Sequence, residues 1–159
     1  MKEIKFRKVL AEDCDDVFRW LNDKETLNAS FHSDPVPYET HKQWFAGSLK
    51  NPQRHIYLAE EKDGNKIGVV RLDRSNEQVA EFAINLAPEM RGKGYGAELI
   101  QVACRRFVSD IGGCFFLARI KKSNPASIKV FKKAGFFEIF NYSDAKWGSV
   151  IALGKIAEV

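Results

Sequence analysis

The chain has 159 residues, of which 45% are hydrophobic and 29% are charged, a composition typical of a soluble globular domain and unlike that of a disordered chain. Lys and Arg exceed Asp and Glu by 25 − 21 = +4, which suits a small anionic ligand and is too weak a charge to indicate nucleic-acid binding. The length predicts a single domain over residues 1–159, and the absence of a signal-peptide core or a membrane-length apolar run leads us to expect a cytoplasmic protein that does not bind membranes.

The first half of the chain alternates short strands with two amphipathic helices. Proline-rich sequence separates the helices, and an Asp-Gly-Asn turn joins the two strands that follow them. The predicted elements are a strand at 4–10, a helix with Cys14, Val17, Phe18 and Leu21 on its core side, a loop at 30–37, a helix at 39–49 with Trp44, Phe45 and Leu49 on its apolar side, and strands at 55–61 and 67–72.

The second half centres on one long amphipathic helix, whose apolar stripe runs from Ile100 to Ile111. The other predicted elements are a strand at 79–86 that Pro88 ends, a fully buried strand at 114–120, a helix at 124–134, and strands at 136–142 and 147–155. The order βααβββαβαββ predicts a mixed α/β domain in which the strands flanking the long helix form a parallel pair. A ligand would then bind at the carboxyl end of the fourth strand.

A glycine-rich segment lies at that position, between Pro88 and the long helix. Glycines allow a ligand to approach the backbone, and the free N–H groups of a helix N-terminus attract an anion. Two basic side chains add positive charge, so the segment is physically suited to a pyrophosphate. Its residues are Arg91, Gly92, Lys93, Gly94, Tyr95 and Gly96.

Two motifs resemble those of the GNAT N-acetyltransferases. The first is Arg91-x-x-Gly94-x-Gly96, which follows Leu86-Ala87-Pro88-Glu89. The second is Asn124-x-x-Ser127-x-x-x-Phe131-x-x-x-Gly135-Phe136, and the resemblance covers nearly the whole chain. It implies a GNAT fold of the mixed α/β class, with a mostly antiparallel twisted sheet, one splayed parallel pair and flanking helices.

The resemblance also implies acetyl-CoA as co-substrate. The backbone of Leu86 and Ala87 would pair with the pantetheine arm, and the amides of residues 91–96 would hold the pyrophosphate. The side chains of Asn124 and Ser127 would lie along the pantetheine. For Asn124 a plain helix N-cap is the alternative role, and the two roles can coexist.

Glu81 is the candidate general base. It shares one strand face with Ala83 and Asn85, whereas Phe82 points to the other face. Relatives often place at this position a carboxylate that takes the amine proton directly or through a water, and the alternative is a salt bridge or a solvated edge. Phe131 stands where many relatives have the tyrosine that protonates the leaving thiolate; Tyr95, Tyr142, Ser127 or a water could substitute, or no acid is needed.

The acceptor side is expected in the first two helices, which carry the segments Trp20-x-Asn22-Asp23 and His41-x-x-Trp44-Phe45. This pair of segments resembles the N-acetyltransferases of nucleotide-linked amino sugars, such as those of the pseudaminic acid pathway. We expect Trp20 to be half exposed and to stack on a sugar or base. The predicted acceptor residues are Arg19, Trp20, Asn22 and His41.

The leading hypothesis is therefore direct transfer from acetyl-CoA to a nucleotide-linked amino sugar, in a protein that could form a homodimer. The alternatives are a ribosomal-protein N-terminal or small-amine acetyltransferase, and a non-catalytic CoA-binding module. The three cysteines, Cys14, Cys104 and Cys114, lack metal-ligand spacing, so we expect reduced thiols and no metal.

Overall fold

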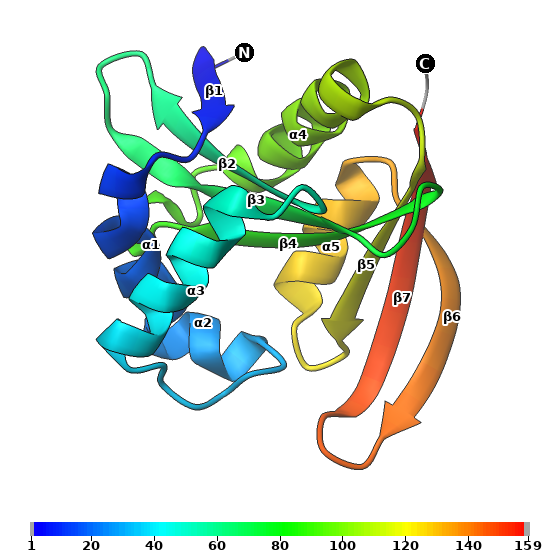
Figure 1. Cartoon of the computed structure of the whole chain (residues 1–159). Helices are drawn as coiled ribbons and strands as arrows, with labels where there is room; N and C mark the ends of the chain where they lie inside the picture. Colours follow the sequence, from blue (N-terminus) through cyan, green and yellow to red (C-terminus); the bar gives the residue numbers. More distant parts are fainter. Residues whose placement is uncertain (1, 158–159) are drawn as a thin grey trace.

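The computed structural model describes residues 2–157, which fold around one seven-stranded sheet of order β1-β2-β3-β4-β5-β7-β6 (Figure 1). All these strands belong to one sheet, which agrees with a single domain. That this domain spans residues 1–159 stays a prediction. The strands are β1 (Ile4–Lys8), β2 (Arg54–Glu61), β3 (Lys66–Arg74), β4 (Val79–Leu86), β5 (Phe115–Lys121), β6 (Phe137–Asp144) and β7 (Gly148–Ile156). The helices are α1 (Cys14–Leu21), α2 (Lys24–Ala29), α3 (Tyr38–Lys50), α4 (Tyr95–Ile111) and α5 (Pro125–Lys133), with 3₁₀ turns η1 (Ala11–Asp13) and η2 (Pro88–Met90).

The strands β4 and β5 form the parallel pair, and the other neighbours in the sheet are antiparallel. The parallel pairing covers three residue pairs and ends at Glu81↔Leu117. Beyond it β4 continues to Leu86 and β5 to Lys121, so the two strands separate toward their carboxyl ends. The predicted mixed α/β fold with a splayed parallel pair is confirmed.

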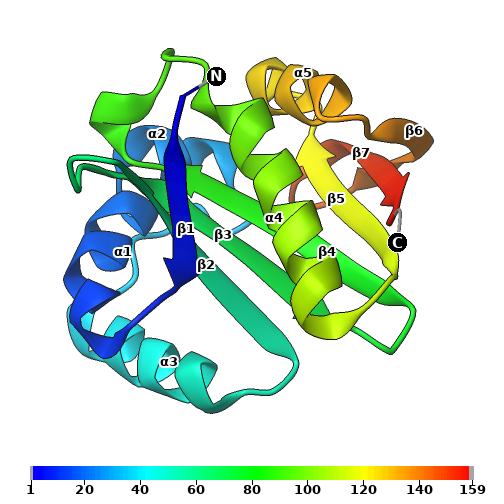
Figure 2. The same cartoon turned by 90° about the horizontal axis from the view of Figure 1, so that it is seen from above.

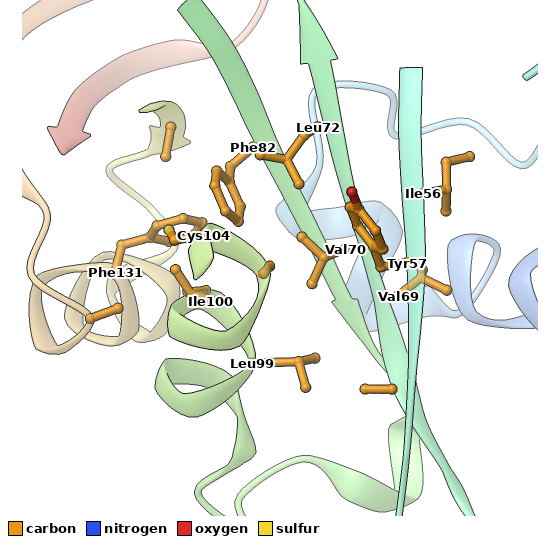
Figure 3. Close-up of a cluster of buried hydrophobic side chains, with 14 of the residues drawn as sticks. Ile56, Tyr57, Val69, Val70, Leu72, Phe82, Leu99, Ile100, Cys104 and Phe131 are labelled. Atoms are coloured by element: carbon orange, nitrogen blue, oxygen red, sulfur yellow. The ribbon is translucent and has the colours of Figure 1, made fainter. Parts of the chain in front are cut away.

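Helices α4 and α5 cover one face of the sheet, and α1 and α3 cover the other (Figures 1 and 2). Under α4 the core is built from side chains of β2, β3 and β4 together with the apolar side of the helix (Figure 3). Phe82 contacts the rings of Phe116, Phe131 and Phe136 with centroids 5.4–6.0 Å apart. Aromatic contacts at such distances favour edge-to-face packing, which fixes α4 and α5 above β4 and β5.

The core side of α1 is not the predicted stripe. Val17 and Trp20 are 1% and 2% exposed, whereas Cys14, Phe18 and Leu21 are only partly buried. The buried positions are 13, 17 and 20, which follow helical spacing but begin with a carboxylate. A pattern of apolar residues alone could not include Asp13. It therefore predicted a buried side that contains Cys14, Phe18 and Leu21 and left Trp20 half exposed.

Asp13 is completely buried and is held by two cations. Arg7 donates to both of its oxygens at 2.8 and 3.1 Å, and Lys66 lies 3.0 Å from Oδ1. Burial alone would raise the pKa of Asp13, but the hydrogen bonds from Arg7, the Leu10 amide and Lys66 lower it to about 2. This cluster ties β1 and β3 to the start of α1.

Several predicted boundaries differ from the structure. The first strand ends at Lys8, because the chain turns into η1 and leaves Leu10 half exposed. Leu49 is also exposed rather than on the packed side of α3. Strand β5 is not fully buried, because Arg119 points to the solvent-facing side. The short helix α2 lies in a segment for which the sequence predicted no helix.

Candidate active site

The glycine segment forms an open cradle at the start of α4. Gly94 is the residue before the helix and has a φ of 84°, a left-handed conformation that favours glycine. No side chain caps α4, and a Cβ on Gly94 would meet nothing within 4 Å. The first N–H groups of a 17-residue helix therefore face open space, as an anion site requires.

Gly96 has a different role from the one expected of a ligand-binding glycine. A Cβ at this position would lie 2.8 Å from Cγ1 of Val130, so Gly96 allows α5 to pack against α4. The neighbouring Tyr95 is buried, and its hydroxyl donates to the carboxylate of Glu61, which raises the pKa of Tyr95 to about 12. This side chain is thus engaged in holding the helix start to β2.

The basic side chains of the segment are not both free for an anion. The guanidinium of Arg91 donates to Asp23, Thr26 and Glu25 around α2. Lys93 is exposed, and its carbonyl accepts a hydrogen bond from Lys2. The Arg91 amide also donates to the carbonyl of Pro88, at 3.3 Å, so in this arrangement neither its side chain nor its N–H is free for an anion, whereas Lys93 can offer its charge.

The end of β4 has backbone groups that face the opening between the separated ends of β4 and β5, here called the splay. Ala87 N–H donates to the carbonyl of Ile67 at 2.8 Å, and its carbonyl accepts from Met90 N–H. The amide of Ala87 is therefore used inside the protein, contrary to the expected pairing with pantetheine. Because backbone groups alternate in direction along an antiparallel pair, Leu86 turns its N–H and carbonyl away from β3. Leu86 is thus the residue free to pair with an extended ligand in the splay.

Helix α5 borders the same opening. Asn124 caps it by accepting a hydrogen bond from Ser127 N–H at 3.3 Å, so the alternative role as an N-cap is present. Phe131 is 2% exposed and packs against Phe82 and Phe136. Phe131 is part of the core at this position, with no group that could protonate a thiolate.

Glu81 lies at the vertex of the splay, meaning the last residue of β4 that pairs with β5. Arg119 Nε donates to its Oε1 at 2.6 Å, so the alternative role of Glu81 as a salt-bridge partner is present in this structure. On the β3 side Glu81 faces Asp73, whose oxygens are contacted by Arg54 at 2.7 Å and Arg71 at 2.9 Å. Two neighbouring carboxylates repel each other, and the arginines on both sides offset this repulsion.

Aromatic side chains that the sequence analysis missed surround Arg119. Its guanidinium lies 5.9 Å from the centroid of Phe31, and Phe31 packs edge-on against Trp147 at 4.8 Å. Glu81, with a smaller contribution from Tyr142, raises the pKa of Arg119. Trp147 Nε1 is buried without a hydrogen-bond partner. These residues come from four distant segments and share no motif, so no sequence signal could have grouped them.

The predicted acceptor residues are engaged in contacts of their own, and none of the hydrogen bonds and ion pairs they make involves Glu81. Trp20 is 2% exposed and belongs to the core, so its predicted half exposure is wrong. His41 is equally buried and its Nε2–H donates to the carbonyl of Cys14; burial lowers its pKa. Arg19 is exposed and pairs with Asp16, and Asn22 binds the backbone of Val36.

Within residues 2–157, no three His, Cys, Asp or Glu side chains come close enough together to hold a metal ion. In the same range no helix combines the length and the apolar character needed to cross a membrane. The three cysteines are free thiols, and burial raises the pKa of each.

Residues 3–137 match the model of the acetyltransferase (GNAT) domain family. A protein of Bacillus subtilis (strain 168), YwnH, provisionally named a phosphinothricin acetyltransferase, is 32% identical over 111 residues, which are 67% of this chain and 66% of that protein. The spermidine N(1)-acetyltransferase of Vibrio cholerae is 23% identical over 121 residues, 74% of this chain and 70% of that enzyme.

The fold is also that of solved acetyltransferase structures. The crystal structure of spermidine N-acetyltransferase from Vibrio cholerae in complex with CoA and spermine superposes with a TM-score of 0.88 at 19% identity, covering 97% of this chain and 95% of that one. A dodecameric structure of the same enzyme superposes with a TM-score of 0.80. The relatives named here are phosphinothricin and spermidine enzymes, and no amino-sugar enzyme is among them.

Proposed function

Because the chain belongs to the GNAT acetyltransferase family, we propose that it transfers an acetyl group from acetyl-CoA to the primary amine of a small molecule. The observation that carries this proposal is the splay of β4 and β5 beside an uncapped, glycine-led helix N-terminus. A Cβ on Gly94 would meet nothing within 4 Å, so the helix start is open at this point, and the free backbone of Leu86 runs into the splay. Both features fit the shape and charge of acetyl-CoA.

The acceptor class favoured here is a small amine rather than a nucleotide-linked amino sugar. The relatives named above act on phosphinothricin or spermidine, according to their names. The nucleotide-sugar hypothesis depends locally on a half-exposed Trp20, and that side chain is buried. The small-amine alternative from the sequence analysis therefore replaces the amino sugar as the leading hypothesis.

Acetyl-CoA supplies the activated acetyl thioester, and the residues around the splay supply the rest. Amides of residues 92–96 and the charge of Lys93 hold the pyrophosphate, while Leu86 aligns the pantetheine and Asn124 and Ser127 border it. Glu81 accepts the proton of the acceptor ammonium, directly or through a water, and Arg119 holds that carboxylate in place. Of the groups considered as acid, Tyr95 is engaged with Glu61, whereas Tyr142 lies on the Arg119 side.

Two further expectations belong to this proposal. Edge strand β6 exposes Phe137, Ile139 and Phe140 by 41–49%, and this apolar surface supports a homo-oligomer of the chain. The relative from Vibrio cholerae forms a dodecamer. A cytoplasmic location is retained as a proposal, because three free thiols suit a reducing compartment.

The test is release of the CoA thiol with a panel of amines, combined with mass spectrometry of the products. The panel contains spermidine, phosphinothricin, a nucleotide-linked amino sugar and a peptide with a free N-terminus. We expect acetylation of a small amine. If CoA binds but none of the amines increases thiol release above the rate of hydrolysis, the non-catalytic CoA-binding module is favoured instead.

A further inference from the structure

Residues 23–36 form an excursion between α1 and α3, here called the α2 segment. It contains α2 and the loop that carries Phe31. None of the six side chains of α2 is buried, so hydrophobic burial contributes little to its position. A helix of six residues is also too short to be stable alone. Its placement must therefore depend on specific contacts at a few points.

The first contact closes the base of the segment. The side-chain oxygen of Asn22 accepts from Val36 N–H at 2.7 Å, and its amide donates to the Val36 carbonyl at 3.2 Å. This pair of hydrogen bonds holds the two ends of the excursion together. It leaves the orientation of α2 between them undetermined.

The second contact is made by Arg91 of the glycine segment. Its Nη2 donates to Asp23 Oδ2 and to Thr26 Oγ1, each at 2.7 Å, and its Nη1 donates to Glu25 Oε2 at 2.9 Å. Asp23 also caps α2 by accepting from Thr26 N–H. Arg91 and Asp23 have side-chain exposures of 24% and 25%, so this ion pair is shielded more than a surface pair.

The third contact lies at the other end of the segment, beside the candidate base. Phe31 packs against Trp147, and the guanidinium of Arg119, which holds Glu81, lies above the Phe31 ring. The α2 segment therefore contacts the glycine segment through α2 and the surroundings of Glu81 through Phe31. A shift of α2 would move Phe31 relative to Arg119.

We infer that Arg91 is a positioning residue for the acceptor side of the site. Its guanidinium fixes α2, and through α2 the Phe31 loop, instead of donating to the pyrophosphate. The inference rests on the proposed function, because that proposal identifies the side of the site around Glu81 as the acceptor side. It assigns the first residue of the glycine motif a side-chain role directed away from the anion cradle.

Two variants separate this role from direct phosphate binding. Asp23→Asn removes the carboxylate charge but keeps a residue type that caps helices well, so loss of the ion pair is separated from loss of the cap. Arg91→Lys keeps the charge near the cradle but replaces the planar guanidinium, whose two terminal nitrogens reach Glu25 on one side and Asp23 and Thr26 on the other, with a single nitrogen. Glu89→Gln is the matched control, because it removes an exposed carboxylate from the neighbouring η2 turn.

The first measurement is amide hydrogen exchange of peptides covering residues 22–31, without ligand. Both variants should speed exchange in α2 by about fivefold or more, the change that follows from losing part of a shielded charge-assisted contact. Exchange in α5 and exchange in the Glu89→Gln control should stay unchanged. Unchanged exchange of α2 in Arg91→Lys and Asp23→Asn would overturn the inference, whether or not the protein transfers acetyl groups.

The second measurement compares calorimetric binding of acetyl-CoA with the KM of the amine found in the panel. Both variants should raise the acceptor KM by about fivefold, while the acetyl-CoA Kd changes by less than about twofold. If Arg91 instead bound the pyrophosphate, Arg91→Lys would weaken the binding of acetyl-CoA. Asp23→Asn, which frees the Arg91 side chain, would then strengthen that binding. Absence of any transfer by the wild-type protein would refute the proposed function but leave the exchange and calorimetry results as the test of Arg91.

Discussion

Nε of Arg119 lies 2.6 Å from Oε1 of Glu81, at the last residue pair before β4 and β5 separate. The contact comes from the second residue of β5 beyond the end of the parallel pairing, so Arg119 reaches back across the opening between the strands. A carboxylate that would otherwise face only Asp73 is thereby held at the vertex of the splay. This geometry suits both of the roles considered for Glu81, and the kinetics of one variant distinguish them.

Glu81→Gln should lower kcat near neutral pH by about 10²-fold, because the amide keeps the shape of the side chain but cannot accept the ammonium proton. Acetyl-CoA affinity, measured by calorimetry, should stay unchanged. A fall in kcat of less than about threefold, which is far below the effect of losing a general base, would make Glu81 a structural partner of Arg119.

Trp20→Ala should reduce the free energy of unfolding by about 3–5 kcal/mol, because the ring is buried beneath α1 and its removal leaves a large cavity. Denaturant titration measures this change, and Arg19→Ala, on the exposed side of the same helix, is the control with a change within about 0.5 kcal/mol. A folded Trp20→Ala protein of wild-type stability with a raised acceptor KM would restore the acceptor-stacking hypothesis.

Stability should fall as the pH is lowered from about 7.5 to 5.5. Burial lowers the pKa of His41 and of His55, so in this range the unfolded chain takes up protons that the folded protein does not. Above the ordinary histidine pKa, His41 and His55 are neutral in both the folded and the unfolded chain, so this loss of stability disappears.

His41→Gln should flatten this dependence in part, since His55 continues to contribute. Thermal unfolding across the pH range measures the slope, with the exposed His32→Gln as control. A slope that is the same in His41→Gln and in the wild type would show that His41 accepts its proton in the folded state.

The sequence predicted the parts of the fold that depend on local patterns. Strand β4 has the predicted bounds, and the long helix ends at Ile111, the last residue of the predicted apolar stripe. The glycine motif and its entry into α4 were located correctly because Pro88 and the glycines act through backbone geometry at their own positions.

The parts that were missed depend on partners distant in the chain. The orientation of α1 was wrong because Asp13 is buried, which is possible only with Arg7 and Lys66 beside it. Val130, which explains Gly96, lies on another helix. The surroundings of Glu81 depend on Arg119 and Phe31, and periodicity along a single segment carries no information about such contacts.

The most direct test of the account concerns Gly94, because the proposed acetyl-CoA site depends on free N–H groups at the start of α4. Gly94→Ala introduces the strain of a positive φ without filling the cradle, and Gly94→Asp adds a carboxylate that can cap the helix and repel a phosphate. Calorimetry should show acetyl-CoA affinity lower in Gly94→Asp than in Gly94→Ala by at least about tenfold, or about 1.4 kcal/mol. Equal affinity in the two folded variants and the wild type would place the cofactor elsewhere and contradict the account.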